Sequence, residues 1–361
     1  MVLIRRIAIN TGGGDAPGLN AVIRAAVLSA EGVGWEILGI RDSYDGLFEE
    51  GGVVRLDRKA VSGITHQGGT ILGTTNRGNP LRWPVKARDG SVTYEDRTSD
   101  VIEALADHGV DALIAIGGDG SLAIANSLAE KGLKVIGVPK TIDNDLAATQ
   151  LTFGFITAVE TATDALDKLH STAESHERVM VVELMGRNTG WIALYAGLAG
   201  TADVILIPEI PYDLGSVCEK IEARYARGRS FAIVVVAEGS YPVGGQPLFK
   251  QTGSGQKRLG GMAEVVAEAI ADRTGRETRS LVLGHLQRGG SPSAYDRLLA
   301  LRFGTAAVRL AEQGAFGCMV ALDPPEVHAV PLAEAISKTK FVPLEGDIVQ
   351  TARAMGICMG D

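Results

Sequence analysis

The sequence lacks the features typical of secreted, zinc-binding or membrane-spanning proteins. Its three cysteines, Cys218, Cys318 and Cys358, lie far apart and form no CxxC pair, so they provide neither a disulfide framework nor a zinc site. No window approaches the roughly 18 uninterrupted apolar residues that a membrane span requires. The N-terminus MVLIRRIAINTGGG has no signal-peptide cleavage pattern. We therefore expect a cytoplasmic protein that does not bind membranes.

Basic charge is also scarce. Thirty-five lysines and arginines face 43 aspartates and glutamates, and the net charge of −8 argues against a nucleic-acid-binding protein, which needs a basic surface. Aromatic residues make up only 5% of the chain, whereas 46 glycines supply many positions for tight loops. The 361 residues exceed the roughly 250–300 at which a single core stops growing, so we expect two domains.

Short apolar runs alternate with helical patterns along nearly the whole chain. The first series has the predicted strands IRRIAIN, WEILGI, DALIAIG and KVIGVP, and the second has RVMVVELMG, DVILIPE, FAIVVVAEG and SLVLGHL. Amphipathic helical segments separate them, as in βαβ units around a parallel sheet. The pattern predicts an α/β fold with two doubly wound, Rossmann-like three-layer domains. Residues 79–99, which lack apolar periodicity, are expected to form a loop.

Two glycine-rich turns follow predicted strands and open helices. One is TGGGDAPG, and the other is GGDGS at residues 117–121. Helix N-termini bind anions, and no GxxxxGK[ST] motif offers an alternative phosphate loop. Asp119 would repel a phosphate unless Mg²⁺ lay between them, so we predict that Asp119 holds Mg²⁺. The alternatives are a plain turn and a weak dinucleotide fingerprint at Gly118, Gly120 and Ala123.

PKTIDND, residues 139–145, follows another predicted strand and contains the next chemical group. Asp143 could accept a proton from an attacking hydroxyl while Thr141 orients a phosphoryl group, and phosphoryl transfer requires mainly positioning and charge neutralisation. An Asx-rich turn without a catalytic role is the alternative.

Several cations are expected around strand ends in this acidic chain: Arg178, Arg187, Arg279, His285 and Arg288. Each alone is more often a solvated or structural residue. Together they indicate that the ligand is an anionic small molecule, because one guanidinium group can donate two hydrogen bonds to two oxygens of a phosphate. A phosphorylated sugar fits, and Glu238 in VVVAEGS could accept hydrogen bonds from its hydroxyls.

Seven motifs occur in order between residues 11 and 292: TGGGDAPGLNAVIR, GGTILGTT, GGDGS, PKTIDND, MGRNTG, AEG and ETRSLVLGHLQRGGSP. Together they resemble the 6-phosphofructokinase family. The resemblance implies transfer of the γ-phosphoryl group of ATP to the 1-hydroxyl of fructose 6-phosphate, giving fructose 1,6-bisphosphate in glycolysis. It also implies a nucleotide- and Mg²⁺-binding domain (1–154 plus 287–337), a sugar-phosphate-binding domain (155–286 plus 338–361) and an active site in the cleft between them.

The resemblance assigns roles residue by residue. Asp119 would hold Mg²⁺ and Asp143 would be the base, with Thr141, Arg187 and Gly14 also catalytic. The nucleotide-binding residues would be Gly13, Gly14, Arg77, Gly118, Asp119, Gly120 and Ser121. Fructose 6-phosphate would contact Thr141, Asp143, Asp145, Arg178, Met185, Gly186, Arg187, Glu238, Arg279, His285 and Arg288. Arg178 and Arg279 would come from a neighbouring subunit, which implies a homo-oligomer, either a tetramer or a dimer.

Three departures from the family pattern affect these expectations. Lys140 is typical of enzymes that use pyrophosphate, whereas Gly120 is typical of those that use ATP; we expect ATP, because glycine leaves room for the nucleotide. Arg77 occurs one place later than the family's arginine. The basic effector pocket of bacterial members retains Arg24, Arg227 and Arg229 but has Leu28 and His170 at two positions, so we expect weak or absent control by nucleoside diphosphate and phosphoenolpyruvate.

Other functions stay open at this point. A pyrophosphate-dependent phosphofructokinase is the nearest alternative. A non-catalytic sensor of nucleotides or sugar phosphates, and a dehydrogenase that binds a nicotinamide cofactor, are more remote.

Overall fold

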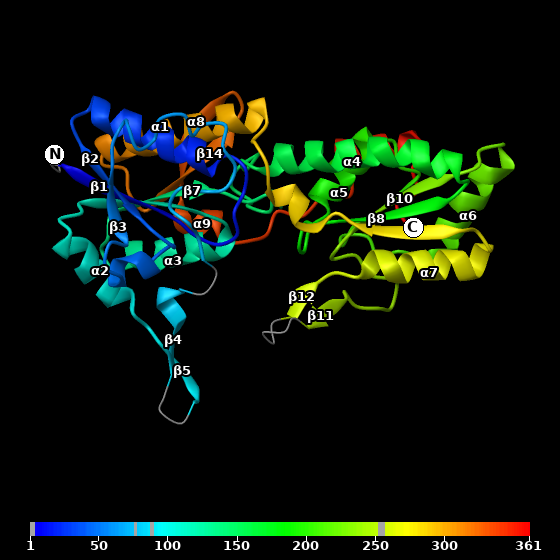
Figure 1. Cartoon of the computed structure of the whole chain (residues 1–361), viewed down its shortest axis with the longest axis horizontal. Helices are drawn as coiled ribbons and strands as arrows, with labels where there is room; N and C mark the ends of the chain where they lie inside the picture. The colour runs from blue at the N-terminus through cyan, green and yellow to red at the C-terminus, as the bar shows by residue number, and fades with distance from the viewer. Residues whose placement is uncertain (1–3, 76–77, 87–89, 252–256) are drawn as a thin grey trace. The chain divides into compact units, whose positions relative to one another are not determined.

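The computed structural model describes residues 4–75, 78–86, 90–251 and 257–361, and the chain divides into two compact units (Figure 1). The first unit comprises Met1–Thr141, Leu146–Gly154 and Arg288–Thr339. The second comprises Ile142–Asp145, Phe155–Gln287 and Lys340–Asp361. Each unit has its own sheet and its own core.

A seven-stranded sheet in the order β15–β14–β7–β6–β1–β2–β3 forms the centre of the first unit. The inner strands are parallel to one another, and the edge strands β15 and β3 are antiparallel to their neighbours. The strands are β1 (Arg6–Thr11), β2 (Glu36–Ile40), β3 (Val53–Leu56), β6 (Ala112–Gly117), β7 (Val135–Pro139), β14 (Cys318–Asp323) and β15 (Glu326–Pro331). Every residue of β6 and β7 is buried, which explains their continuous apolar sequence.

Helices cover both faces of this sheet (Figure 1). Ile7 and Ile9 of β1 pack with α1 and α8, while Ala8 between them packs on the side of α2, α3 and α9. This alternation follows from the two-residue period of a strand. The helices are α1 (Leu19–Gly32), α2 (Thr98–Asp107), α3 (Asp119–Glu130), α8 (Ala294–Glu312) and α9 (Leu332–Ala335).

The second unit is built on a four-stranded parallel sheet in the order β13–β8–β10–β9. Its strands are β8 (Val179–Leu184), β9 (Val204–Leu206), β10 (Ala232–Ala237) and β13 (Thr278–Val282). One face packs against α6 (Leu214–Ala226) and α7 (Met262–Thr274). The other packs against α4 (Phe155–Ser175) and α5 (Trp191–Ala199), and α10 (Asp347–Ala354) contacts α5. The predicted fold class, two three-layer doubly wound domains, is confirmed.

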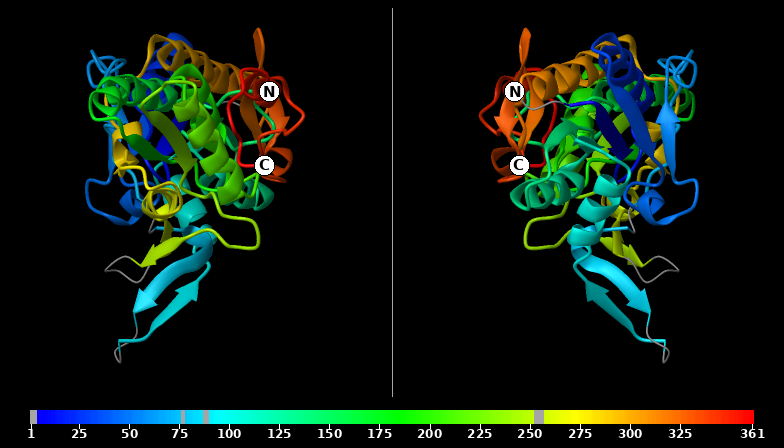
Figure 2. Two further views of the ribbon diagram at one scale, coloured as in Figure 1. Left: turned by 90° about the vertical axis from the view of Figure 1, so that its right-hand side faces the viewer. Right: turned by 90° about the vertical axis from the view of Figure 1, so that its left-hand side faces the viewer.

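Short elements complete the chain: η1 (Asp45–Phe48), η2 (Pro80–Arg82), η3 (Gly284–Arg288) and the hairpins β4 (Trp83–Lys86)–β5 (Val92–Glu95) and β11 (Phe249–Gln251)–β12 (Lys257–Leu259). The β4–β5 hairpin extends away from the sheet of the first unit (Figure 2). The expectation of a loop at residues 79–99 is therefore wrong. All four residues of β5 are exposed, so this strand has no buried face.

The turn Ile142–Asp145 packs within the second unit, although the expected boundary assigned it to the first. What each unit binds stays a prediction. Within the described part of the chain, no helix is both long enough and apolar enough to cross a bilayer.

The packing of α1 against α8 gives a stability prediction. A Cβ at Gly304 would lie 2.5 Å from the Val22 carbonyl oxygen and 2.9 Å from the Ala25 Cβ, so the helices approach through a glycine. Overpacking costs about 1–3 kcal/mol, more than the roughly 1 kcal/mol of helix propensity that alanine adds. Gly304→Ala should therefore lower the thermal unfolding midpoint by about 3 °C or more.

Gly32→Ala is the matched control, because a Cβ at Gly32, in the same helix pair, would meet nothing within 4 Å. Its unfolding midpoint should equal or exceed that of the parent protein. Equal midpoints for the two variants would show that the approach of α1 to α8 does not depend on Gly304.

Candidate active site

Two glycine turns follow neighbouring strands of the first sheet. β1 pairs with β6, and the Gly12 N–H donates to the Ile116 carbonyl over 2.9 Å. A Cβ at Gly12 would lie 2.7 Å from the Ser121 Oγ, and one at Gly117 would also collide with the Ser121 side chain. The turns therefore lie side by side because glycine permits it. Binding of a polyphosphate there stays a prediction.

A third loop supports the first turn. The Thr74 hydroxyl donates to the Gly13 carbonyl over 2.6 Å and approaches the Thr11 carbonyl at 3.1 Å. The Gly13 N–H donates to the Thr75 carbonyl over 3.3 Å, and the φ of Gly13 is 78°, in the left-handed region. The motif GGTILGTT thus has a structural role. Arg77, predicted to bind the nucleotide, lies outside the described residues.

The start of α3 is exposed beside these turns. Gly118 precedes the helix, and Asp119 is its first residue. Both Asp119 and Gly120 are exposed, and a Cβ at Gly120 would meet nothing within 4 Å. Because the first N–H groups of an α-helix have no acceptor within the helix, this start favours an anion.

The carboxylate at the start of α3 suits Mg²⁺ better than a metal ion held by protein side chains alone. Among residues 4–75, 78–86, 90–251 and 257–361, no group of three or more His, Cys, Asp or Glu side chains could cage a metal. Mg²⁺ is commonly bound by one or two carboxylates together with phosphate oxygens, and an exposed carboxylate at a helix start suits that pattern. Asp119 as the Mg²⁺ residue stays a prediction.

Positive charge lies next to Gly14. The Lys140 ammonium donates to the Gly14 carbonyl, and the lysine is only 4% exposed. The Arg288 Nη1 donates to the Asp15 carbonyl over 3.0 Å and would lie 2.9 Å from a Cβ at Gly14. The structure thus brings Arg288, expected to bind the sugar phosphate, against the glycine turn of the first unit.

The turn Ile142–Asp145 belongs to the second unit. Asp143 is 3% exposed, and Asn144 adopts the left-handed conformation with φ of 52°. The Thr189 hydroxyl lies 3.2 Å from the carbonyl oxygens of both Asp143 and Gly186. Thr189 therefore connects the turn to the MGRNTG loop, a role that the sequence motif did not indicate.

The MGRNTG loop follows β8 and has an unusual backbone. Gly186 and Arg187 have φ of 148° and 52°. The Glu238 Oε1 accepts the N–H groups of Gly186 and Arg187 over 3.3 and 2.9 Å, and any side chain at Gly239 would collide with the Arg187 carbonyl. The AEG motif thus shapes the loop, and the exposed Arg187 projects from it.

Arg178 and Arg279 lie elsewhere. Arg178 precedes β8 and Arg279 is near the start of β13, and both bind Glu277, over 2.9 and 2.6 Å. The Arg178 hydrogen bond is the main reason why the pKa of Glu277 is lowered. Since β8 separates Arg178 from Met185 at about 3.3 Å per residue, these arginines lie near the amino ends of their strands. They are near strand ends as expected, and their binding of a sugar phosphate stays a prediction. His285, which follows β13 in η3, is exposed.

The residues that differ from a basic effector pocket have structural roles. Leu28 packs against the core of the first unit. The His170 Nε2 lies 2.8 Å from the Gly200 carbonyl and 3.1 Å from the Thr201 hydroxyl. The Arg24 Nη1 donates to the Val61 carbonyl over 2.8 Å. Weak effector control stays a prediction, as do the roles of Arg227 and Arg229.

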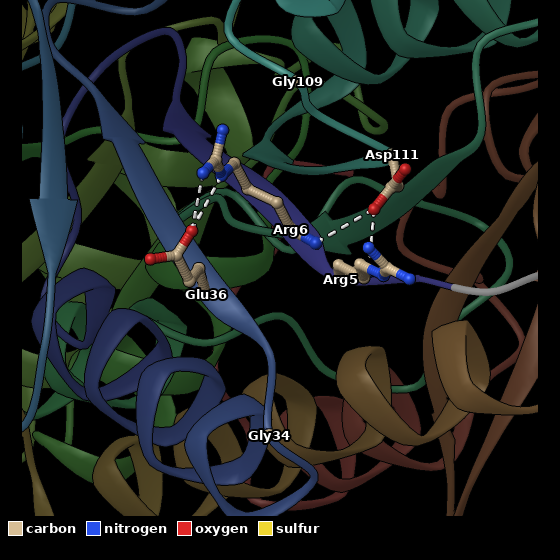
Figure 3. Close-up of a pocket in the computed structure, with 6 residues that line it drawn as sticks. All are labelled: Arg5, Arg6, Gly34, Glu36, Gly109 and Asp111. Atoms are coloured by element: carbon tan, nitrogen blue, oxygen red, sulfur yellow. Dashed lines mark hydrogen bonds and ion pairs between the residues drawn. The ribbon is translucent and has the colours of Figure 1, made fainter.

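A separate pocket of about 560 Å³ lies at the amino end of β1 (Figure 3). Its two arginines do not make it a phosphate site. The Arg6 guanidinium binds Glu36 over 2.7 Å, and Asp111 accepts the backbone N–H groups of Arg5 and Arg6. The Glu36 carboxylate thus compensates the Arg6 guanidinium, and Asp111 adds a second negative charge to the pocket lining. The pocket is lined by Arg5, Arg6, Gly34, Glu36, Gly109 and Asp111.

The chain is similar to known proteins over most of its length. The phosphofructokinase family pattern matches residues 6–311. An "ATP-dependent 6-phosphofructokinase" of Chloroflexus aurantiacus is 52% identical over 359 residues, covering 99% of this chain and 98% of the relative. A "pyrophosphate–fructose 6-phosphate 1-phosphotransferase" of Amycolatopsis methanolica is 51% identical over 346 residues, covering 94% of this chain and 97% of that relative.

A solved structure gives the same result for the fold. The crystal structure of Pichia pastoris phosphofructokinase in the T-state matches with a TM-score of 0.80 and 29% identity. The match covers 99% of this chain and 37% of the Pichia chain, so this chain spans about a third of that protein. On the family match and the identity shared along the whole chain, the chain belongs to the phosphofructokinase family.

Proposed function

We propose that this protein is an ATP-dependent 6-phosphofructokinase that transfers the γ-phosphoryl group of ATP to the 1-hydroxyl of fructose 6-phosphate. The observation that supports it most directly is the contact between the two glycine turns, at Gly12 and Gly117, beside the exposed start of α3. The relatives named ATP-dependent 6-phosphofructokinase support the same activity.

The donor is assigned to the turns of the first unit. Backbone N–H groups at Gly120 and Ser121 would bind phosphate oxygens, as helix N-termini do. Mg²⁺, held by Asp119 and phosphate oxygens, would supply neutralisation of the donor's negative charge. Lys140 and Arg288 add positive charge next to Gly14.

The acceptor is assigned to the loops of the second unit, at Met185, Gly186, Arg187, Glu238 and His285. Asp145 and Arg288 would also contact the sugar phosphate. Asp143 would accept the proton of the 1-hydroxyl while the oxygen of that hydroxyl forms a bond to the γ-phosphorus. The bond between that phosphorus and the bridging oxygen breaks, and ADP leaves. Thr141 and Arg187 would orient and neutralise the transferring group.

Two features bear on the choice of donor. The space next to Gly120 is open, which suits the α-phosphate and nucleoside of ATP. Lys140 and the 51% identical pyrophosphate-dependent relative favour pyrophosphate as the second candidate. The ammonium of Lys140 is directed to the Gly14 carbonyl, so the lysine need not occupy the space beside Gly120.

We also propose a homo-oligomer. Arg178 and Arg279 lie at the amino ends of β8 and β13, away from the loops that follow these strands. A sugar phosphate that contacts these arginines would therefore be bound in a neighbouring subunit.

Initial rates with ATP and with pyrophosphate, at one fructose 6-phosphate concentration and with Mg²⁺ present, test the proposed function. We expect turnover with ATP. Turnover with pyrophosphate alone would establish the second candidate, and binding without turnover would indicate a sensor.

Replacing Asp143 by asparagine tests the base. The amide cannot accept the proton, so kcat should fall by about 10²–10⁴-fold while the Kd for fructose 6-phosphate changes little. Steady-state kinetics and calorimetry measure the two quantities. The exposed Asp167→Asn on α4 is the control and should match the parent enzyme. Near-normal kcat in Asp143→Asn would reject the role.

Replacing Gly120 tests the donor site. A side chain fits there, so Gly120→Asp should fold, but its carboxylate would crowd and repel the α-phosphate of ATP. We expect kcat/KM for ATP to fall at least about tenfold, whereas use of pyrophosphate is unaffected or gained. Gly120→Asn, of equal size without the charge, separates crowding from repulsion. Unchanged ATP kinetics in both variants would place the nucleotide elsewhere.

A further inference from the structure

A segment near the C-terminus is fixed to both loops of the second unit that carry the proposed chemistry. The Lys340 N–H donates to the Asp145 carbonyl over 2.8 Å, and the Lys340 carbonyl accepts the Trp191 Nε1–H over 2.7 Å. The Val342 N–H donates to the Glu209 Oε1 over 3.0 Å. Residues 340–342 thus connect the IDND turn with the start of α5.

Glu209 also fixes the MGRNTG loop. Both of its carboxylate oxygens accept the Gly190 N–H, over 3.0 and 3.1 Å. Burial raises the pKa of Glu209, and the backbone donors at Val342 and Gly190 oppose that shift. The segment that carries Lys340 is therefore anchored independently of the lysine side chain.

The Lys340 side chain reaches the turn itself. Its ammonium donates to the Asn144 Oδ1 over 2.9 Å, and Asn144 is 1% exposed. A non-glycine residue in the left-handed region persists when its surroundings fix it. One lysine thus holds both residues that directly follow Asp143, Asn144 through its side chain and Asp145 through its backbone.

The Lys340 side chain is half-buried, so its ammonium is partly shielded from water. Burial lowers the pKa of Lys340 to about 8, and the Asp145 carboxylate opposes the shift. From α5, the Trp191 ring faces the ammonium at 5.6 Å from the ring centroid, which favours the charged form through a cation–π contact. Lys340 therefore changes charge within an accessible range of pH.

We propose that Lys340 is a positioning residue for phosphoryl transfer, one that holds the Ile142–Asp145 turn so that the Asp143 carboxylate faces the acceptor hydroxyl. The proposal rests on the proposed function. Lys340 touches neither substrate nor reacting atoms in this scheme and acts through Asn144 and Asp145. Because reactions are sensitive to displacements of about 1 Å, relaxation of this turn should slow the chemical step more than it weakens binding.

Lys340→Met removes the charge and the donors while retaining the length of the side chain. We expect kcat to fall by about 10–100-fold and the KM values for fructose 6-phosphate and ATP to change less than about threefold. Lys338→Met is the matched control, since Lys338 is exposed and lies only two positions before Lys340 in the chain. It should have the kcat of the parent enzyme.

The pH profile separates positioning from a structural role. In the parent enzyme, kcat should decrease as pH rises through about 8, because Lys340 then loses its proton. Lys340→Arg keeps its charge at every accessible pH. It should recover part of kcat and lack the decrease near pH 8, whereas Lys340→Met should give a low, flat profile. If Lys340→Met does not fold, Lys340→Arg and the parent profile decide.

The outcomes are distinguishable. A parent protein without phosphotransferase activity overturns the proposed function, and the role of Lys340 with it. If the parent is active, two results would overturn the role of Lys340 alone. One is a kcat of Lys340→Met within twofold of the parent's kcat. The other is the same decrease in kcat near pH 8 in Lys340→Arg as in the parent.

Discussion

The close approach of backbone between β1 and α3 is the constraint on which the donor site depends. Neighbouring parallel strands end at the same edge of a sheet, and the chain leaves β1 and β6 through Gly12 and Gly117. A Cβ at either glycine would strike Ser121. The absence of these two side chains allows the start of α3 to lie beside the TGGG turn, with Asp119 and Gly120 exposed. Lys140 and Arg288 add positive charge beside this turn, at the Gly14 and Asp15 carbonyls.

In the second unit, the proposed chemistry depends on the Ile142–Asp145 turn, which is almost completely buried. Asp143 is 3% exposed, and the conformation of this turn places its side chain. Thr189 approaches the Asp143 carbonyl, and Lys340 holds the two residues that follow. Shielding a lysine ammonium from water is costly unless it is paired, and Asn144, Asp145 and the Trp191 ring compensate the half-buried Lys340. The energetic cost of shielding this lysine is consistent with the proposed role of Lys340 in positioning the turn.

The sequence predicted local features better than distant ones. Buried parallel strands such as β6 are continuous apolar runs, so the fold class and the loops after the strands could be inferred. The contacts of Lys340 could not, because Asn144 lies 196 residues away and no motif surrounds the lysine. The hairpin β4–β5 was missed because β5 has no buried face. Arg178 and Arg279 were placed near strand ends correctly, but at the amino ends, since position in a motif does not give direction along a strand.

The conflict between Lys140 and Gly120 becomes smaller when their surroundings are compared. The sequence contains two residues that are typical of different donors, yet they occupy different parts of the site. Lys140 follows β7, is 4% exposed and directs its ammonium to the Gly14 carbonyl, so it supports the TGGG turn. Gly120 lies on the exposed start of α3, where nothing occupies the position of a Cβ. A lysine fixed to backbone is compatible with either donor, whereas an open position beside α3 matters only for a donor larger than pyrophosphate. For that reason Gly120 is the stronger indicator.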